Sequence, residues 1–327
     1  MSTAVCTEVT PQCPVSLTLY GYRPNAPVNG VLGVIFGICL LVQLGSVCFF
    51  RVRTWSYTTP LALGALIELI GYAGRLLMHH NPWGTLGIAM QLIALIVAPS
   101  FIAAAVSVTF KHIIMYCGPE HSMLRPRFVP LLMIGTDFIG IIIQFIGAGI
   151  LAMAVTADVM DKDRVDLGDN IIIFGVAFQV FIMIACGAYM VHYWLRVKNA
   201  TAVLAKRVEP QTYEMEAAAA PGYEMPPVSG HEEHKRTGES KLVVKFRQFC
   251  WAIVFSFVTI FVRCVYRLVE MASGWGSAVQ QDEPSFLVCD GLMIVLAVIA
   301  LTIFQPGFFF APMMRKSNGA KAGYGSV

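Results

Sequence analysis

Charged and polar side chains recur at helical spacing within an apolar part of the sequence. Glu68, Tyr72 and Arg75 stand at i, i+4 and i+7, which places them on one stripe of an α-helix. The segment 263–270 (RCVYRLVE) repeats this arrangement with the order of the charges reversed. A carboxylate and a guanidinium with a phenol nearby can bind a polar head group, or they can pair two helices with each other.

The composition indicates that lipid surrounds most of this chain. Of 327 residues, 57% are hydrophobic and only 13% are charged, whereas a soluble domain averages about 25% charged residues. The net charge of +3 is too small to favour nucleic acid as a partner. The sequence therefore predicts an all-α integral membrane protein.

Seven apolar runs are long enough to cross a bilayer, which takes about 20 residues. They lie near 28–50, 58–78, 86–110, 128–154, 170–195, 247–271 and 285–309. Lys and Arg gather in alternate connections, which predicts an extracytoplasmic N-terminus and a cytosolic C-terminus.

The predicted organisation has four parts. An extracytoplasmic arm occupies residues 1–26 and the seven-helix bundle residues 27–310. The segment 196–246 is rich in Pro, Glu and Ala and is predicted to be a disordered cytosolic loop, and residues 311–327 form a cytosolic tail. Cys6 and Cys13 stand together in the arm, where an oxidising compartment would allow a disulfide. We expect no metal and no cofactor, and the sequence leaves the oligomeric state open.

Ionisable residues within the spans are the main functional signal. They are Glu68, Arg75, Asp137, Arg263, Arg267, Glu270 and Asp290, three bases against four acids with a formal sum of −1. Each costs roughly 2.5–3.5 kcal/mol at the centre of a helix in the bilayer, so we expect them to pair inside the bundle. Spans two and six run in the same direction, so Glu68 is expected to meet an arginine of span six, and Arg75 to meet Glu270.

Uncharged polar residues extend this set along other spans. Gln144 lies seven residues after Asp137, span three contributes Gln91 and span five contributes Gln179. The predicted substrate-binding residues are therefore Glu68, Tyr72, Arg75, Gln91, Asp137, Gln144, Gln179, Arg263, Arg267, Glu270 and Asp290, around a polar cavity that opens toward the extracytoplasmic leaflet. The alternative is that these salt bridges only fix helix packing.

The order of motifs resembles the fungal RTA-like family, also called the lipid-translocating exporter family. The resemblance rests on E-x-x-G-Y-x-x-R at 68–75, Gln91 with APSF at 98–101, Asp137 with Gln144 and Gly147, R-x-x-Y-R-x-x-E at 263–270 and D-x-x-M at 290–293. It extends from about residue 19 to residue 307. Two positions depart from the family pattern: Gln305 replaces a histidine, and Ser107 replaces a tyrosine.

The resemblance implies a stress-induced membrane protein that moves amphiphilic lipids or toxic compounds outward. The expected substrates are sphingoid long-chain bases, sterol amines or xenobiotics, with drug resistance as a consequence. The plasma membrane is the expected location, and an internal membrane is the alternative. In this scheme an acid among Glu68, Asp137, Glu270 and Asp290 would bind the amine.

Other classes of seven-helix protein fit less well. The sequence has no G-x-x-x-x-G-K-[ST] loop for an ATP-driven pump, and span seven has no lysine for a retinal Schiff base. The histidines form no H-x-x-x-H pair for a zinc hydrolase, so we do not expect an enzyme. A seven-helix receptor or lipid sensor without transport activity remains the alternative function.

Overall fold

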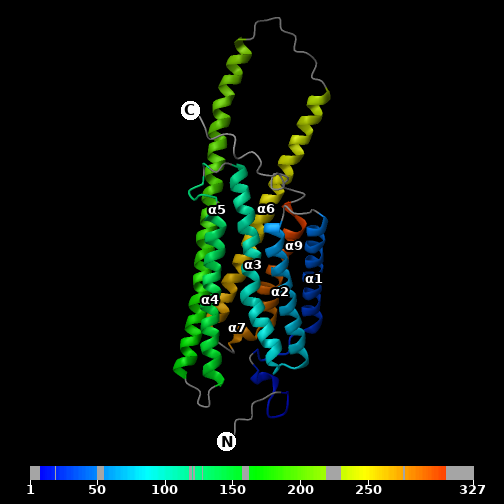
Figure 1. Ribbon diagram of the computed structural model, residues 1–327, viewed down its shortest axis with the longest axis vertical. Helices are drawn as coiled ribbons and strands as arrows, with labels where there is room; N and C mark the ends of the chain where they lie inside the picture. The colour runs from blue at the N-terminus through cyan, green and yellow to red at the C-terminus, as the bar shows by residue number, and fades with distance from the viewer. Residues whose placement is uncertain are drawn as a thin grey trace.

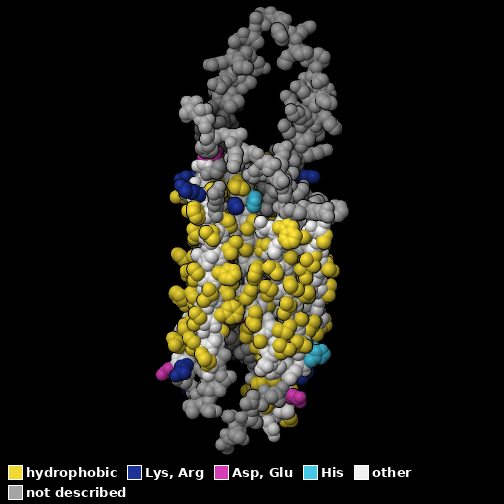
Figure 2. Space-filling model, in the orientation of Figure 1, with side chains coloured by type: hydrophobic (Ala, Val, Ile, Leu, Met, Phe, Trp, Pro, Cys, Tyr) yellow, Lys and Arg dark blue, Asp and Glu magenta, His cyan; other side chains and the backbone are white. Residues whose placement is uncertain are grey.

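The computed structural model describes residues 8–18, 20–49, 55–117, 120, 122–126, 128–156, 162–218, 230–274 and 277–306. Within these residues, seven helices are long and apolar enough to cross a membrane. A band of hydrophobic side chains covers the visible face of the bundle, and charged side chains gather toward its two ends (Figure 2). The chain is therefore a multi-pass integral membrane protein, as the composition predicts.

The first five long helices are α1 (Ala26–Phe49), α2 (Trp55–His80), α3 (Thr85–Cys117), α4 (Phe128–Thr156) and α5 (Lys162–Ala218). They are followed by α6 (Gly230–Ala272), the short helices α7 (Ala278–Gln281) and α8 (Glu283–Phe286), the π-helix η3 (Leu287–Leu292) and α9 (Met293–Ile303). A short 3₁₀ helix, η1 (Val15–Leu17), lies in the N-terminal arm. The last span is thus built from α8, η3 and α9 together.

The two ends of the bundle differ in what they carry (Figure 1). At one end, here called the arm end, lie the N-terminal arm and α7. At the opposite end, the loop end, α5 and α6 continue as helices past the rest of the bundle. These extensions reach Ala218 and begin at Gly230, so both enter the segment 196–246 that is predicted to be a loop. Its disorder, and the side of the membrane on which each end lies, stay predictions.

Small residues let two pairs of helices approach closely. A Cβ atom added at Gly71 of α2 would lie 2.5 Å from the Cβ of Ala94 in α3, and one at Gly147 of α4 would lie 2.8 Å from the carbonyl oxygen of Gly168 in α5. Small residues at helix interfaces are the usual basis of tight packing in membranes. The helices α3 and α4, and likewise α5 and α6, pack on each other less extensively than the helices within the two pairs. A looser seam therefore runs between α3, α4, α5 and α6.

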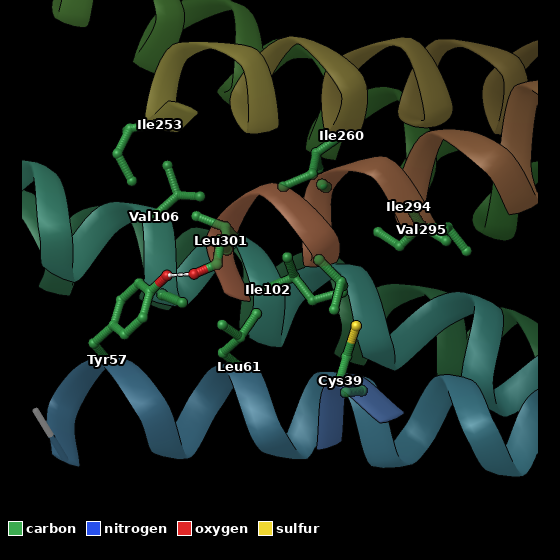
Figure 3. Close-up of a cluster of buried hydrophobic side chains, with 14 of the residues drawn as sticks. Cys39, Tyr57, Leu61, Ile102, Val106, Ile253, Ile260, Ile294, Val295 and Leu301 are labelled. Atoms are coloured by element: carbon green, nitrogen blue, oxygen red, sulfur yellow. Dashed lines mark hydrogen bonds between the residues drawn. The ribbon is translucent and has the colours of Figure 1, made fainter. Parts of the chain in front are cut away.

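A hydrophobic core fixes the helices that surround the last span (Figure 3). Leu61, Ile102, Ile294 and Leu301 are all buried within it. The hydroxyl of Tyr57 donates a hydrogen bond of 2.6 Å to the carbonyl oxygen of Leu301, which satisfies a buried polar group that would otherwise be costly. This core holds α2, α3, α6 and α9 in place around the charged residues.

Candidate functional site

A cluster of three charged side chains lies buried in the bundle, formed by Glu68 of α2, Arg263 of α6 and Asp290 of η3. It is called the central cluster below. The side chain of Arg263 donates hydrogen bonds from Nε to Oδ1 of Asp290 at 2.8 Å and from Nη2 to Oδ2 at 3.4 Å. Arg263 Nη2 also lies 3.3 Å from Oε1 of Glu68. Arg263 is 0% exposed, Glu68 is 2% exposed and Asp290 is 1% exposed. Water therefore does not screen their charges.

The local backbone explains how Asp290 reaches Arg263. Asp290 lies in the π-helix η3, which packs against α6. A π-turn inserts an extra residue into a helix, and such turns are frequent at functional sites. Gly291 follows, and an added Cβ there would lie 2.7 Å from the hydroxyl oxygen of Tyr72. The ring of Tyr72 stacks on Phe36 with a centroid distance of 5.5 Å, so the phenol is held against the π-turn.

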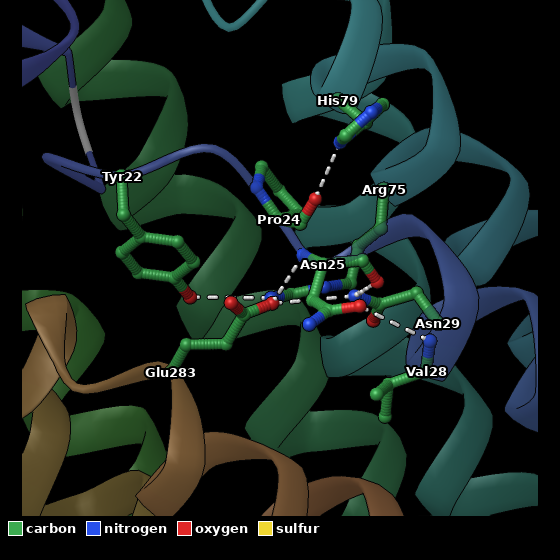
Figure 4. Close-up of polar contacts among 8 residues, drawn as sticks. All are labelled: Tyr22, Pro24, Asn25, Val28, Asn29, Arg75, His79 and Glu283. Carbon is green, nitrogen blue, oxygen red and sulfur yellow. Dashed lines mark hydrogen bonds and ion pairs between the residues drawn. The ribbon is translucent and has the colours of Figure 1, made fainter.

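A second set of polar residues surrounds Glu283 at the arm end (Figure 4). This arm cluster consists of Tyr22, Asn25, Asn29, Arg75 and Glu283. Arg75 Nη2 lies 3.3 Å from Glu283 Oε1 and donates a hydrogen bond of 3.2 Å to the Tyr22 hydroxyl. The backbone N–H of Asn25 and the amide of Asn29 also donate to Glu283 Oε1, at 2.7 and 3.3 Å. The cluster thereby ties the N-terminal arm to α2 and α8.

Two further contacts strengthen this attachment. The guanidinium of Arg75 lies 4.2 Å above the centre of the Phe286 ring, a cation–π contact. His79 Nδ1 lies 2.8 Å from the carbonyl oxygen of Pro24. Burial raises the pKa of the Tyr22 hydroxyl, although the charge of Arg75 opposes that shift. Tyr22 therefore remains protonated and neutral around neutral pH.

One of the two pairings expected between spans two and six is wrong. Glu68 does lie beside Arg263 of α6, as expected. Arg75, however, contacts Glu283 rather than Glu270. The reason is that Glu270 Oε2 already receives a hydrogen bond of 2.5 Å from Arg267, one turn earlier on the same helix. Arg75 instead reaches the first residue of the last span.

A cavity of about 650 Å³ opens along the seam between α3, α4, α5 and α6. Its walls are mostly apolar, with Ile88, Leu95, Pro99 and Val176 among them. Four of the predicted site residues also line it, namely Gln144, Gln179, Arg263 and Arg267. This volume falls in the range of about 300–1,000 Å³ that is typical of ligand pockets. It is called the seam cavity below.

The seam cavity and the central cluster share Arg263. Within the cavity the two glutamines are joined, because Gln144 Nε2 donates to Gln179 Oε1 at 3.3 Å. Gln179 Nε2 in turn donates to the Ser100 hydroxyl at 3.5 Å. A ligand in this cavity would thus contact apolar walls, the hydrogen-bonded side chains of Gln144 and Gln179, and Arg263 of the central cluster.

A much smaller cavity of about 10 Å³ lies beside Glu68. This polar chamber is lined by Glu68, Tyr72, Arg75 and Gln91, together with the apolar residues Gly71, Ala94, Leu95 and Phe286. Hence Tyr72 and Gln91, both predicted for the site, lie beside Glu68. Asp137 lies elsewhere, in a separate small cavity with Ser107, Met133 and Cys186. The structure thus groups ten of the eleven predicted residues along one continuous region and places Asp137 apart from it.

Sequence reasoning missed part of the arm cluster. Tyr22, Asn25, Asn29 and Glu283 were not among the predicted site residues. A signal for Asn29 was present, since an amide at i+4 from Asn25 in the first turn of an apolar span needs a polar partner. The disulfide expected between Cys6 and Cys13 also stays a prediction, because Cys6 lies outside the described residues.

The fold and the buried charges define a seven-helix membrane protein with an intramembrane polar site. The profile of a family described as "RTA1 like protein" matches residues 61–313. Since this match covers most of the 327 residues, the chain belongs to the RTA1-like family, as the order of motifs indicates.

Three proteins of Saccharomyces cerevisiae illustrate its similarities. The chain is 28% identical over 297 residues to the sphingoid long-chain base transporter RSB1, covering 90% of this chain and 75% of that protein. It is 30% identical over 97 residues to protoporphyrin uptake protein 1, covering 29% of this chain and 32% of that protein. It is 27% identical over 138 residues to the uncharacterized membrane protein YLR046C, covering 42% of this chain and 48% of that protein. No solved structure matches the chain.

Proposed function

We propose that this chain moves amphiphilic lipids with a cationic amine head group, sphingoid long-chain bases in particular, out of the cytosolic leaflet. One observation carries the proposal: an apolar cavity large enough for a lipid tail ends at a buried cluster with more negative than positive charge. The similarity to a named sphingoid long-chain base transporter over 90% of the chain supports the same substrate class.

Counting charges in the central cluster explains the preference for a cation. Two carboxylates, Glu68 and Asp290, face one guanidinium, Arg263, so the ionised cluster has a formal charge of −1. An uncompensated buried charge is strongly unfavourable. An ammonium group that enters from the seam cavity would neutralise it, and a hydroxyl on the lipid could bond to Gln144 or Gln179.

In this mechanism Glu68 is the carboxylate that changes partner. Arg263 Nη1 has no hydrogen-bond partner, and Arg263 Nη2 forms an ion pair with Glu68 beside its hydrogen bond of 3.4 Å to Asp290. A bound ammonium would take over the Glu68 carboxylate, while the Arg263 fork stays on Asp290. The pair Arg267 and Glu270, on the same helix and nearer the arm end, would supply the next carboxylate in the outward direction.

The finer biological role follows from this chemistry. Sterol amines and cationic xenobiotics combine an apolar body with an ammonium group, so the same site would accept them and confer resistance to them. The extracytoplasmic N-terminus predicted from the basic residues would make the arm end the exit side. The plasma membrane is the location at which outward movement would clear such compounds from the cell.

A reconstitution experiment tests the proposal. Purified protein in liposomes should accelerate the crossing of a labelled N-trimethylated sphingoid base, whose fixed charge slows spontaneous crossing. An N-acylated sphingoid base, which has no charge, serves as the control lipid. We expect acceleration for the cationic lipid only. If neither lipid crosses faster than in empty liposomes although the protein binds the cation, the lipid-sensor alternative is favoured instead.

A pair of bulky substitutions tests the seam cavity itself. Ala148→Trp places a large ring at the cavity wall and should reduce the rate of lipid crossing by about tenfold or more. Val31→Trp is the matched control, because Val31 of α1 is 60% exposed on the outside of the bundle. Equal rates for the two variants would remove the seam cavity from the mechanism.

A further inference from the structure

The hydrogen bonds of the central cluster divide its two carboxylates into different roles. Arg263 bonds to both oxygens of Asp290, which is the two-point geometry that best stabilises an ionised carboxylate. Its contact with Glu68 is an ion pair of 3.3 Å, and Glu68 Oε1 has no hydrogen-bond partner. Asp290 is therefore matched by Arg263, and the negative charge of Glu68 is the one left over.

Polar atoms without hydrogen-bond partners converge on the chamber beside Glu68. They are Oε1 of Glu68, the hydroxyl of Tyr72, both amide atoms of Gln91, and Nε and Nη1 of Arg75. All four side chains are buried, at 2–3% exposure. Buried polar groups are rarely left unbonded. The chamber volume of about 10 Å³ is close to the room that one water molecule occupies.

The chamber also lies one side chain away from the arm-end surface. Arg75 lines the chamber and contacts Glu283, whose side chain is 17% exposed. The charged and titratable groups around Glu68 are Tyr72 and Arg75 on its own helix, Arg263 from α6 and Asp290 from η3, and α3 contributes the neutral Gln91. No second cation among the described residues lies within ion-pair distance of Glu68.

We propose that Glu68 binds a proton when the central cluster is empty and releases it when a cationic head group binds. The chain would then exchange one proton for one amphiphilic cation. This inference rests on the proposed function and adds its driving force. When the ammonium arrives, the Glu68 O–H bond breaks and the proton leaves toward the side from which the cation came. Once the cation has left at the arm end, a proton from that end reaches Glu68 through a water in the chamber. One positive charge moves in each direction, and no oxidant or reductant is needed.

The exchange predicts a defined dependence of binding on pH. A proton and the cation compete for the same carboxylate, so low pH weakens binding. With a probe whose charge is fixed, the affinity should fall about tenfold for each pH unit below the pH at which Glu68 is half-protonated, and become constant above it. The N-trimethylated sphingoid base is such a probe because its ammonium group has no proton to lose.

Proton release during binding tests the inference directly. The purified full-length protein in detergent, at low buffer concentration with a pH indicator, is titrated with the N-trimethylated sphingoid base at acidic pH. We expect release of about one proton per bound probe for the wild type, none for Glu68→Gln, and wild-type release for Asp166→Asn. Asp166 is an exposed acid on α5 outside both cavities.

The outcomes separate this inference from the proposed function. If the wild type binds the probe without releasing a proton, the exchange is wrong while transport of cations stands. If the wild type does not bind the probe at all, both are wrong. Should Glu68→Gln fail to fold, the pH dependence of binding to the wild type decides the matter, and an affinity that does not change between about pH 5 and pH 8 overturns the exchange.

Discussion

The central cluster and the arm cluster both join arginine to carboxylate, yet they differ in charge balance and surroundings. In the arm cluster, one arginine faces one carboxylate, and Glu283 also receives hydrogen bonds from Asn25 and Asn29. In the central cluster, one arginine faces two carboxylates that are almost entirely buried. A balanced, well-bonded pair suits a structural attachment, whereas an unbalanced buried charge persists in proteins mainly where it has a function.

The surroundings of the clusters reinforce this division. The arm cluster connects the N-terminal arm, α2 and α8, and the side chain of Glu283 reaches solvent. The central cluster borders the seam cavity through Arg263 and the polar chamber through Glu68. Variants of the two clusters should therefore separate, with loss of transport at the centre and loss of stability at the arm end.

The largest effect is expected for Arg263→Met. This change leaves Glu68 and Asp290 buried without a cation, which typically costs about 3–5 kcal/mol. We expect a markedly lower unfolding temperature in detergent and no measurable transport in liposomes. The double variant Arg263→Met with Asp290→Asn also removes the carboxylate charge that Arg263 matches and should recover part of the stability. Unchanged stability of the single variant would show that the cluster is not ionised.

Replacing each of the two carboxylates of the central cluster should change the stability of the protein by a different amount. Asp290→Asn removes the two-point bond to Arg263 and should lower the free energy of unfolding by about 2–4 kcal/mol. Glu68→Gln keeps that bond, so its effect on unfolding should stay within about 1 kcal/mol. Denaturant unfolding of both variants measures the difference. A larger loss for Glu68→Gln than for Asp290→Asn would contradict the division of roles.

A glycine substitution tests the geometry around Asp290. In Gly291→Ala the new methyl group would lie 2.7 Å from the Tyr72 hydroxyl oxygen, so either the π-turn or Tyr72 must shift. Overpacking of this kind costs about 1–3 kcal/mol, and we expect a comparable fall in stability with reduced transport. Gly30→Ala on α1 is the control, because nothing lies within 4 Å of the added atom. Similar unfolding curves for both variants would show that the π-turn tolerates displacement.

The smallest effect is expected at the arm cluster. Glu283→Gln removes the charge that Arg75 faces but keeps an oxygen that can accept the hydrogen bonds of Asn25 and Asn29. Because these hydrogen bonds then go to a neutral acceptor, we expect the free energy of unfolding to fall by about 1–2 kcal/mol. Protease sensitivity of the N-terminal arm and the unfolding temperature report the change. An arm that stays equally protected would argue against its attachment through Glu283.

Much of the fold follows from the sequence because the bilayer imposes simple requirements. Apolar length alone located all seven spans, and each has a matching helix among the described residues. Hydropathy could not show that α5 continues to Ala218 or that α6 begins at Gly230, because helix formation outside the membrane does not require apolar residues. It also could not show the π-turn at Asp290, which inserts a residue without changing the composition of the span.

The site was predictable where both partners lie on long helices of known direction. Glu68 and Arg263 belong to such helices, so their shared depth could be inferred and the pairing is confirmed. Arg75 lies near the end of α2, where short segments such as the arm and α8 also lie. Helical spacing gives no position for such segments, and the pairing with Glu270 was wrong for that reason. Cavities depend on how helices pack, so the seam cavity and the polar chamber could not be located from spacing.

The most direct test of this account compares the two clusters in one assay. Wild type, Glu68→Gln and Glu283→Gln are reconstituted at equal density, and the initial rate of crossing of the N-trimethylated sphingoid base is measured. Each substitution removes one carboxylate charge and keeps the side-chain length. The account predicts a rate at least about tenfold lower for Glu68→Gln, because a neutral residue no longer attracts the cation, and a rate within about threefold of wild type for Glu283→Gln. A Glu68→Gln rate equal to wild type, or a larger loss for Glu283→Gln, would contradict it.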